Sequence, residues 1–218
     1  MTPRLIAFDL DGTLVDSRRD LADSVNAMLA GFGAAPLPDA LVGAMVGDGA
    51  AMLVRRALGA AGLSAVGHGD ALARFLAEYD RRLLAHTRPY DGIVALLEAL
   101  GAGRRLAVLT NKPGNATRAI LRGLELDRFF DAVISGDGPL PRKPDPGGLL
   151  ALARRAGVTP AETMLVGDSA IDLETARRAG TRVCVARWGF GYPPGGLALR
   201  EGELAADSPA ALRAMLGA

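Results

Sequence analysis

From Pro89 onward, short apolar runs alternate with amphipathic segments, and this alternation narrows the possible folds more than any other feature. The runs at 104–109, 132–134, 163–166 and 182–186 are typical of buried strands, and the segments between them carry apolar residues at helical spacing. Strands that alternate with helices predict a parallel sheet with right-handed crossovers. We therefore expect an α/β fold with a doubly wound, Rossmann-like core.

One further apolar run, Leu5 to Phe8, lies far ahead of the others in the chain. The residues between this run and Pro89 carry apolar side chains at helical spacing, and none of them forms a run typical of a strand. The simplest topology is an α/β core of residues 1–16 and 88–218, interrupted by an all-helical cap domain of residues 17–87.

Several helix ends can be placed from local signals. Ser17 and Asp20 resemble a capping box at the start of a helix that is expected to run to about residue 31. Gly180 is expected to end a helix over about 171–179. A closing helix is expected after Ser208.

Polar side chains gather just past the expected strands. Asp9 and Asp11 follow the first strand, and Asp168 and Asp172 follow the strand at 163–166. Because ligands of open parallel sheets bind outside the carboxyl ends of the strands, these four carboxylates are expected to meet at one edge. Two charges about 4 Å apart cost on the order of 4 kcal/mol at an effective dielectric near 20, so a cation must lie among them. Oxygen ligands without a His or Cys cluster favour Mg²⁺.

Lysine is almost absent from the chain. Of the 25 basic residues only Lys112 and Lys143 are lysines, and both precede a proline in an expected loop. A compact ammonium group is a point-charge partner for a phosphate or a carboxylate. The loop that carries Lys143 could bring it to the same sheet edge.

The charge balance excludes some classes of partner. The formal net charge is +1, and basic and acidic residues are interspersed along the chain, so no basic tract for nucleic acid or anionic lipid is present. The single cysteine, Cys184, is expected to pack in the core. No stretch is apolar over the length of a membrane span and no targeting segment is evident, so a cytoplasmic location is the default expectation.

Four short motifs occur in a fixed order along the chain. They are Asp9 to Ser17, Thr110-Asn111, Lys143-Pro144, and Gly167 to Asp172. Together they resemble the four motifs of the haloacid dehalogenase-like hydrolases, and each lies at an expected strand end or in the adjacent loop. The second acid of the first motif, Asp11, favours a phosphate ester over a halide as the substrate.

This resemblance implies a phosphatase that works through an aspartyl phosphate. Asp9 would be the nucleophile, and Asp11 would act as general acid and then as general base. Thr110, Asn111 and Lys143 would hold the phosphoryl oxygens.

The resemblance also implies a bound Mg²⁺. Its ligands would be the side chain of Asp9, the backbone carbonyl of Asp11 and the side chain of Asp168. Asp172 would hold Asp168 or Lys143 in position without binding the metal or the substrate itself.

Helical caps inserted after the first motif resemble those of phosphoglycolate phosphatases, β-phosphoglucomutases and small pyrophosphatases. The segments Thr110-Asn111-Lys112-Pro113 and Trp188-Gly189-Phe190-Gly191 look most like phosphoglycolate phosphatases, so 2-phosphoglycolate is the expected substrate. The turn containing Gly49 is the candidate specificity element of the cap, and Arg55 or Arg18 is the candidate partner of the substrate carboxylate.

Other functions stay open from the sequence. A sugar-phosphate phosphatase, a β-phosphoglucomutase-like enzyme or a pyrophosphatase would share the same motifs. A phosphoryl-accepting signalling domain would also use an acid at a strand end, but it would leave the helical insertion unexplained. In each case the partner is a small phosphorylated metabolite or group, and the chain could be a monomer or a homodimer.

Overall fold

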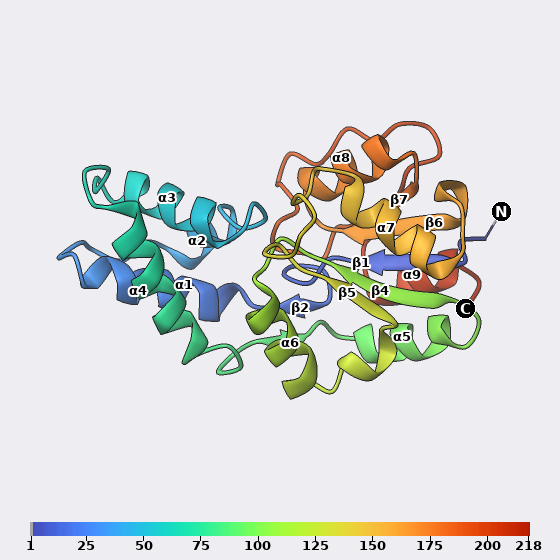
Figure 1. Cartoon of the computed structure of the whole chain (residues 1–218), viewed down its shortest axis with the longest axis horizontal. Helices are drawn as coiled ribbons and strands as arrows, with labels where there is room; N and C mark the ends of the chain where they lie inside the picture. Colours follow the sequence, from blue (N-terminus) through green and yellow to red (C-terminus); the bar gives the residue numbers. More distant parts are fainter. Residues whose placement is uncertain (1) are drawn as a thin grey trace.

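The computed structural model describes residues 2–218 of the chain, and two lobes lie side by side in it (Figure 1). The larger one, here the sheet lobe, is built on a parallel sheet with the strand order β5-β4-β1-β6-β7-β8. These strands are β1 (Leu5–Phe8), β4 (Arg105–Leu109), β5 (Ala132–Ile134), β6 (Thr163–Gly167), β7 (Arg182–Ala186) and β8 (Leu204–Ala206). The doubly wound α/β core is confirmed, and β8 is a strand that the sequence did not predict.

Helices cover both faces of this sheet. Ile6 and Phe8 of β1 pack with one set of helices, whereas Leu5 and Ala7 pack with the other, as the two-residue period of a strand requires. The first set is α5 (Ile93–Gly101), α6 (Gly114–Gly123) and α9 (Pro209–Met215), and the second is α7 (Gly147–Ala156) and α8 (Ala170–Ala179). Two short 3-10 helices, η1 (Asp127–Phe129) and η2 (Pro160–Glu162), precede β5 and β6. Burial on both faces explains why the strands are continuous apolar runs.

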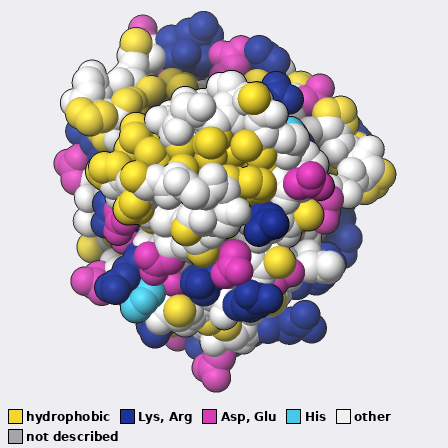
Figure 2. Space-filling view, turned by 90° about the vertical axis from the view of Figure 1, so that its left-hand side faces the viewer, with side chains coloured by type: hydrophobic (Ala, Val, Ile, Leu, Met, Phe, Trp, Pro, Cys, Tyr) yellow, Lys and Arg dark blue, Asp and Glu magenta, His cyan; other side chains and the backbone are white. Residues whose placement is uncertain are grey.

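The smaller lobe, here the helical lobe, contains four helices and is formed by the segment in which only helices were expected. They are α1 (Arg18–Ala30), α2 (Asp39–Gly43), α3 (Ala50–Ala60) and α4 (His68–Asp80). This lobe has a hydrophobic cluster of its own, with Val25, Leu29, Val54 and Phe75 among its buried members. Figure 2 views the molecule from this end and shows a band of hydrophobic side chains across the upper half of the face, with charged side chains above and below it.

A narrow two-stranded ribbon joins the lobes. β2 (Val15–Asp16) runs antiparallel to β3 (Arg88–Pro89), with Val15 opposite Pro89 and Asp16 opposite Arg88. The chain therefore leaves the sheet lobe and returns to it at adjacent positions. Two-residue strands are too short to show a period, so this pairing has no signal in the sequence.

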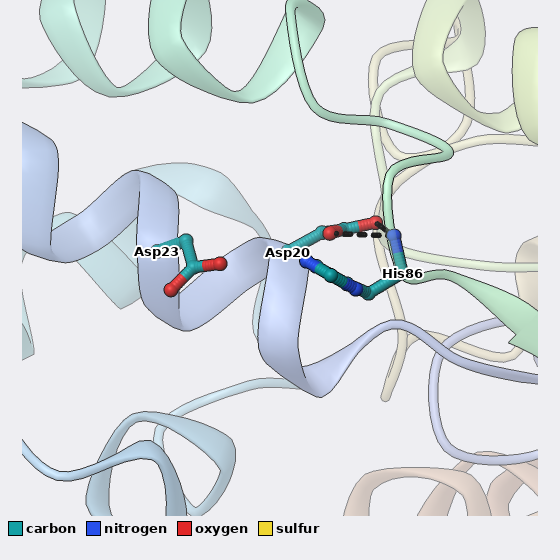
Figure 3. A group of neighbouring side chains, drawn as sticks. All are labelled: Asp20, Asp23 and His86. Atoms are coloured by element: carbon teal, nitrogen blue, oxygen red, sulfur yellow. Dashed lines mark hydrogen bonds between the residues drawn. The ribbon is translucent and has the colours of Figure 1, made fainter.

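The predicted capping box at the start of α1 is wrong. Ser17 is the N-cap residue but makes no capping hydrogen bond with its side chain; its hydroxyl donates instead to Asp11 Oδ1 at 2.5 Å. The Asp20 carboxylate accepts hydrogen bonds from the backbone N–H groups of His86 and Thr87 at 2.8–3.0 Å, and from the Thr87 hydroxyl at 2.7 Å. Figure 3 shows Asp20 joined in this way to the linker at His86. Both side chains bind partners outside the helix, and a local motif cannot reveal such partners.

The predictions for Gly180, for the closing helix and for Cys184 are confirmed. Gly180 ends α8 in the left-handed conformation with φ of 64°, and the closing helix is α9. Cys184 is fully buried in the core. Trp188 donates its indole N–H to the carbonyl oxygen of Thr13 and packs against the core. Over the part of the chain that the structure describes, no helix combines the length and apolar character needed to cross a membrane.

Candidate active site

Three neighbouring strands deliver polar residues to one edge of the sheet. β1 lies between β4 and β6 in parallel register, and Asp9, Thr110 and Asp168 are the residues that follow these three strands. The backbone N–H of Asp9 donates to the carbonyl oxygen of Val166, which continues the ladder one residue past β1. The strand ends therefore converge as the sequence predicted.

Lys143 lies between two of the carboxylates. Its Nζ atom is 2.8 Å from Asp9 Oδ1 and 2.6 Å from Asp172 Oδ1, and all three residues are buried. Burial alone would lower the pKa of the Lys143 ammonium, but the negative charges of Asp172 and Asp9 outweigh it and raise the pKa. Lys143 is therefore a fixed positive charge at the end of β1.

The start of α8 holds Asp172 in place. Ser169 is the N-cap residue, and the Asp172 Oδ2 atom accepts hydrogen bonds from the Ser169 hydroxyl at 2.6 Å and from its backbone N–H at 3.2 Å. With Oδ1 bound to Lys143, both oxygens of this carboxylate are engaged. These contacts place Asp172 beside Lys143 and not beside Asp168 in hydrogen-bonding terms, so support of Lys143 is the one of its two expected roles that the geometry favours.

Asp168 has far fewer partners. Its side chain is buried, and among residues 2–218 the only group that donates a hydrogen bond to it is the Gly191 backbone N–H, at 2.7 Å. Gly12, Gly189 and Gly191 pack closely around the carboxylate; a Cβ atom on Gly12 would lie 1.9 Å from Asp168 Oδ2. Burial, followed by the charges of Asp172 and Asp9, raises the pKa of Asp168 well above its usual range.

The nucleophile candidate has a similar environment. Burial is the main cause that raises the pKa of Asp9 to about 6; the charge of Lys143 lowers it, and that of Asp172 raises it. Asp9, Asp168 and Asp172 each present one oxygen such that the three atoms lie within 4.8 Å of one another. Buried carboxylates with one lysine among them leave excess negative charge, so Asp9 and Asp168 fit a hard divalent cation such as Mg²⁺.

Asp11 is held separately from this group. Its two carboxylate oxygens accept hydrogen bonds from Lys112 Nζ, each at 3.0 Å, and Oδ1 also accepts one from Ser17. Lys112 Nζ donates in addition to the hydroxyl of Tyr79, a residue of α4 in the helical lobe, at 2.6 Å. Burial alone would lower the pKa of Lys112, but Asp11 and Tyr79 raise it, so the ammonium stays charged.

The second motif contributes two different side chains. Thr110 faces the cavity described below, and its hydroxyl oxygen accepts the Lys112 backbone N–H at 3.3 Å. The Asn111 side chain accepts from the Lys143 backbone N–H at 2.8 Å and donates to the carbonyl oxygens of Lys143 and Gly47, both at 2.9 Å. The structure therefore places the Asn111 amide as a brace for the Lys143 loop, with its hydrogen-bonding groups already engaged.

A cavity of about 180 Å³ lies between the two lobes and is lined by the strand-end residues on one side. The sheet lobe contributes Asp9, Asp11, Thr110, Asn111, Lys112 and Asp168 among others. The helical lobe contributes Leu21, Val46, Gly47, Gly49, Ala50, Leu53, Phe75, Leu76, Tyr79 and Asp80. The wall from the helical lobe is thus mostly apolar and carries no cationic side chain among the residues that the structure describes.

The three candidate specificity residues of the cap are placed differently. Gly49 lines the cavity at φ of 87°, and a Cβ atom there would lie 3.1 Å from the Asn111 carbonyl oxygen. Arg55 is exposed on α3 and does not line the cavity. Arg18 is exposed beside the linker, where its Nη2 atom is 3.7 Å from Asp16 Oδ2. The geometry therefore does not bring either arginine to the cavity wall.

Sequence reasoning missed three residues that touch the site. The rarity of lysine is the signal in the sequence that points to Lys112. Tyr79 has only the spacing of an amphipathic helix, and Ser17 only the position of a helix cap. Their partners are distant in the sequence or belong to the other lobe, so residue spacing could not connect them to Asp11.

Comparison with known proteins agrees with this geometry. Residues 6–186 match the family model described as haloacid dehalogenase-like hydrolase. A phosphoglycolate phosphatase of Rhodospirillum rubrum is 45% identical over 199 residues, which cover 88% of this chain and 83% of the relative. A plasmid-encoded phosphoglycolate phosphatase of Cupriavidus necator is 38% identical over 213 residues, covering 97% and 92%. The solved structure of a predicted phosphoglycolate phosphatase from Haemophilus somnus has a TM-score of 0.92 at 32% identity, and the match covers 99% of this chain and 98% of that one.

Proposed function

The chain belongs to the haloacid dehalogenase-like hydrolases and is a phosphatase of that family, and we propose that it hydrolyses 2-phosphoglycolate with the help of Mg²⁺. One observation carries the chemical part of this proposal. Lys143 lies between Asp9 and Asp172 at the end of the central strand, and Asp9 faces the cavity between the lobes. A carboxylate fixed beside a cation at a cavity wall is suited to attack a bound phosphoryl group.

In the first step an oxygen of Asp9 forms a bond to phosphorus while the bond from phosphorus to the ester oxygen breaks. Asp11 donates a proton to that leaving oxygen, which departs as the alcohol. The Lys143 ammonium and the Thr110 hydroxyl hold the phosphoryl oxygens, whose negative charge they offset. The product of this step is an aspartyl phosphate on Asp9.

In the second step a water molecule attacks the same phosphorus. Asp11, now ionised, accepts a proton from that water, and the bond between phosphorus and the Asp9 oxygen breaks. Inorganic phosphate leaves and both aspartates return to their starting protonation states. Two moderate barriers thus replace the single large barrier of direct hydrolysis.

Mg²⁺ would be held by the carboxylates of Asp9 and Asp168, with the backbone carbonyl of Asp11 as a further ligand. The sparse hydrogen bonding of Asp168 and the raised pKa values of both carboxylates support this site, because buried acids without enough donors favour a bound cation. When bound, the ion supplies positive charge that offsets the charge of the phosphoryl group.

The choice of 2-phosphoglycolate rests on the named relatives and on the cavity. The cavity is small, at about 180 Å³, and the only polar side chains that the helical lobe adds to its wall, within the described residues, are Tyr79 and Asp80. A cavity of this size suits a small phosphate ester. We take the helical lobe, residues 17–87, as the cap domain that excludes water from the reaction.

A substrate panel tests the proposal. Phosphate release is measured for 2-phosphoglycolate, glucose 1-phosphate and pyrophosphate, with Mg²⁺ and with EDTA. We expect the largest kcat/KM for 2-phosphoglycolate and loss of turnover in EDTA. A preference for either of the other two would refute the substrate assignment, and stable phosphorylation of the wild type without turnover would show a phosphoryl-accepting signalling domain instead.

A further inference from the structure

We propose that Lys112 is a positioning residue for Asp11, and that Tyr79 of the helical lobe orients Lys112, so that the lobe sets the place of the proton donor. This inference rests on the proposed function, because it assigns a task to the general acid of that reaction. It adds two residues, one from each lobe, to the parts that the four motifs supply.

Every N–H donor of the Lys112 ammonium group has an acceptor. It carries three N–H donors, and its three acceptors are Asp11 Oδ1 at 3.0 Å, Asp11 Oδ2 at 3.0 Å and the Tyr79 hydroxyl at 2.6 Å. Lys112 is also only 5% exposed, so water does not compete for these donors. With no donor left over, the group is arranged to hold a carboxylate and not to bind a phosphoryl oxygen.

Tyr79 is itself fixed by the helical lobe. It is 3% exposed, and its ring stacks on Phe75 with the centroids 5.7 Å apart and the planes inclined by 10°. Lys112 Nζ lies 4.4 Å from the Tyr79 ring centroid as well as within hydrogen-bond distance of the hydroxyl. The lysine is therefore held between an aromatic side chain of one lobe and a carboxylate of the other.

The remaining contact of Asp11 also depends on the lobe. Ser17, which donates to Asp11 Oδ1 at 2.5 Å, directly precedes α1. A movement of the helical lobe away from the sheet would remove Tyr79 from Lys112 and shift Ser17. The carboxylate of Asp11 would then lose its alignment when the cavity is open to water.

The neighbouring residue makes a parallel connection. Asn111 binds the carbonyl oxygen of Gly47 in the helical lobe and both backbone polar groups of Lys143. Asn111 and Lys112, adjacent in the loop between β4 and α6, thus each connect the helical lobe to one residue of the reaction: Asn111 to the backbone of Lys143, and Lys112 to the side chain of Asp11. Such an arrangement couples lobe closure to the geometry of the catalytic groups.

A competing role for Lys112 is recognition of the substrate carboxylate, because Lys112 lines the cavity. The two roles predict different losses of rate for esters with different leaving groups. A proton donor matters for an alkyl ester such as 2-phosphoglycolate or ethyl phosphate, whose alkoxide leaves poorly, and much less for p-nitrophenyl phosphate. A carboxylate ligand matters only for 2-phosphoglycolate.

The test measures kcat and KM of the wild type and of Lys112→Met for these three esters. We expect kcat/KM to fall about 100-fold for both alkyl esters and less than about threefold for p-nitrophenyl phosphate. At saturating 2-phosphoglycolate, kcat should fall as well. A loss confined to 2-phosphoglycolate, with KM raised and kcat unchanged, would overturn the proposal in favour of carboxylate binding, and an equal loss on all three esters would show a merely structural role.

A second variant, which leaves Lys112 in place, tests the proposal even if Lys112→Met disturbs the fold of the site. Tyr79→Phe retains the stacked ring and removes only the hydroxyl, and we expect the same dependence on the leaving group with a smaller loss, about tenfold. Tyr192→Phe, the same change at a tyrosine that does not line the cavity, serves as the matched control. An unchanged Tyr79→Phe enzyme would refute the role of the helical lobe, whereas a wild type that hydrolyses none of the three esters would refute the proposed function itself.

Discussion

Two buried aspartates, Asp20 at the linker and Asp168 at the sheet edge, differ in the donors that surround them. Asp20 receives hydrogen bonds from the backbone of His86 and from the backbone and hydroxyl of Thr87. Within residues 2–218, Asp168 receives one hydrogen bond, from the backbone of Gly191, and faces two further acids. Both are almost completely shielded from water, with 0% and 2% of their surface exposed.

The difference separates a structural acid from a functional one. A buried carboxylate with enough donors can tie two segments together, and here it ties α1 to the returning linker. A buried carboxylate with too few donors stores an unfavourable free energy that a bound cation can remove. Asp20 and Asp23 lie near His86 in a group that could formally hold a metal, but the donors on Asp20 already occupy its carboxylate (Figure 3).

The largest effect is expected at the sheet edge. Asp9→Asn should lower kcat by at least about 1000-fold, because the amide cannot attack phosphorus. Steady-state phosphate release measures the loss, and a mass-spectrometric search for the phosphorylated protein should find none in the variant. Residual activity above about a tenth of the wild type would contradict the role of Asp9 as nucleophile.

Asp168→Asn tests the sparse hydrogen bonding directly. Activity should fall by about 100-fold or more, whereas the melting temperature in EDTA at pH 7 should rise, because the variant no longer buries a charge without sufficient donors. Mg²⁺ should raise the melting temperature of the wild type but not that of the variant. A lower melting temperature in EDTA would show that the carboxylate is stabilising without metal.

The difference in melting temperature between the wild type and Asp168→Asn in EDTA should depend on pH in a definite direction. The pKa of Asp168 in the folded protein is raised, so the folded state binds this proton more tightly than the unfolded state does. The unfolded value is about 4, so raising the pH from about 4 toward 7 should destabilise the metal-free wild type relative to Asp168→Asn. Thermal melts in EDTA at several pH values measure the difference in melting temperature between Asp168→Asn and the wild type, which should increase with pH. A difference that stays constant would refute the raised pKa.

At the linker the expected effect lies in stability. Asp20→Asn removes a buried charge-assisted network and turns an amide N–H₂ toward N–H donors, so the free energy of unfolding should fall by about 2–4 kcal/mol. Denaturant unfolding in EDTA measures it. Asp23→Asn, on the same helix and partly exposed, is the control and should change stability by less than about 0.5 kcal/mol. If Asp20→Asn lowered kcat while leaving the free energy of unfolding unchanged, Asp20 would be a functional residue and not a structural one.

The smallest effects are expected for the exposed arginines. Arg55→Ala and Arg18→Ala should each change KM for 2-phosphoglycolate by less than about twofold, because neither side chain lines the cavity. Initial-rate kinetics over a range of substrate concentration measures this. A rise of tenfold in either variant would restore the initial hypothesis that a cap arginine binds the substrate carboxylate.

The sequence was sufficient for the features that local pattern controls. The apolar runs and helical periods located the sheet and most helices, and the strand ends located Asp9 and Asp168 because parallel strands share an edge. Lys143 lies in a loop, and its rarity as a lysine was the signal that singled it out. The sequence was insufficient where a residue could bind either a neighbour in its own helix or a partner far away in the chain. Ser17 and Asp20 have the spacing of a capping box, yet Asp20 binds residues 66 and 67 positions further along the chain. Tyr79 likewise has the spacing of a core residue, and only the packing of α4 against the other lobe reveals its contact with Lys112.

The paired linkers β2 and β3 have a consequence for how such a protein can change over evolution. Because residues 16 and 88 lie opposite each other in one ribbon, the chain enters and leaves the inserted segment at one place, much as it would enter and leave a short hairpin loop. A segment attached in this way can be lengthened, shortened or exchanged without altering the order of the strands. The inserted segment can therefore diverge in length and sequence while the order of the strands in the sheet lobe stays the same.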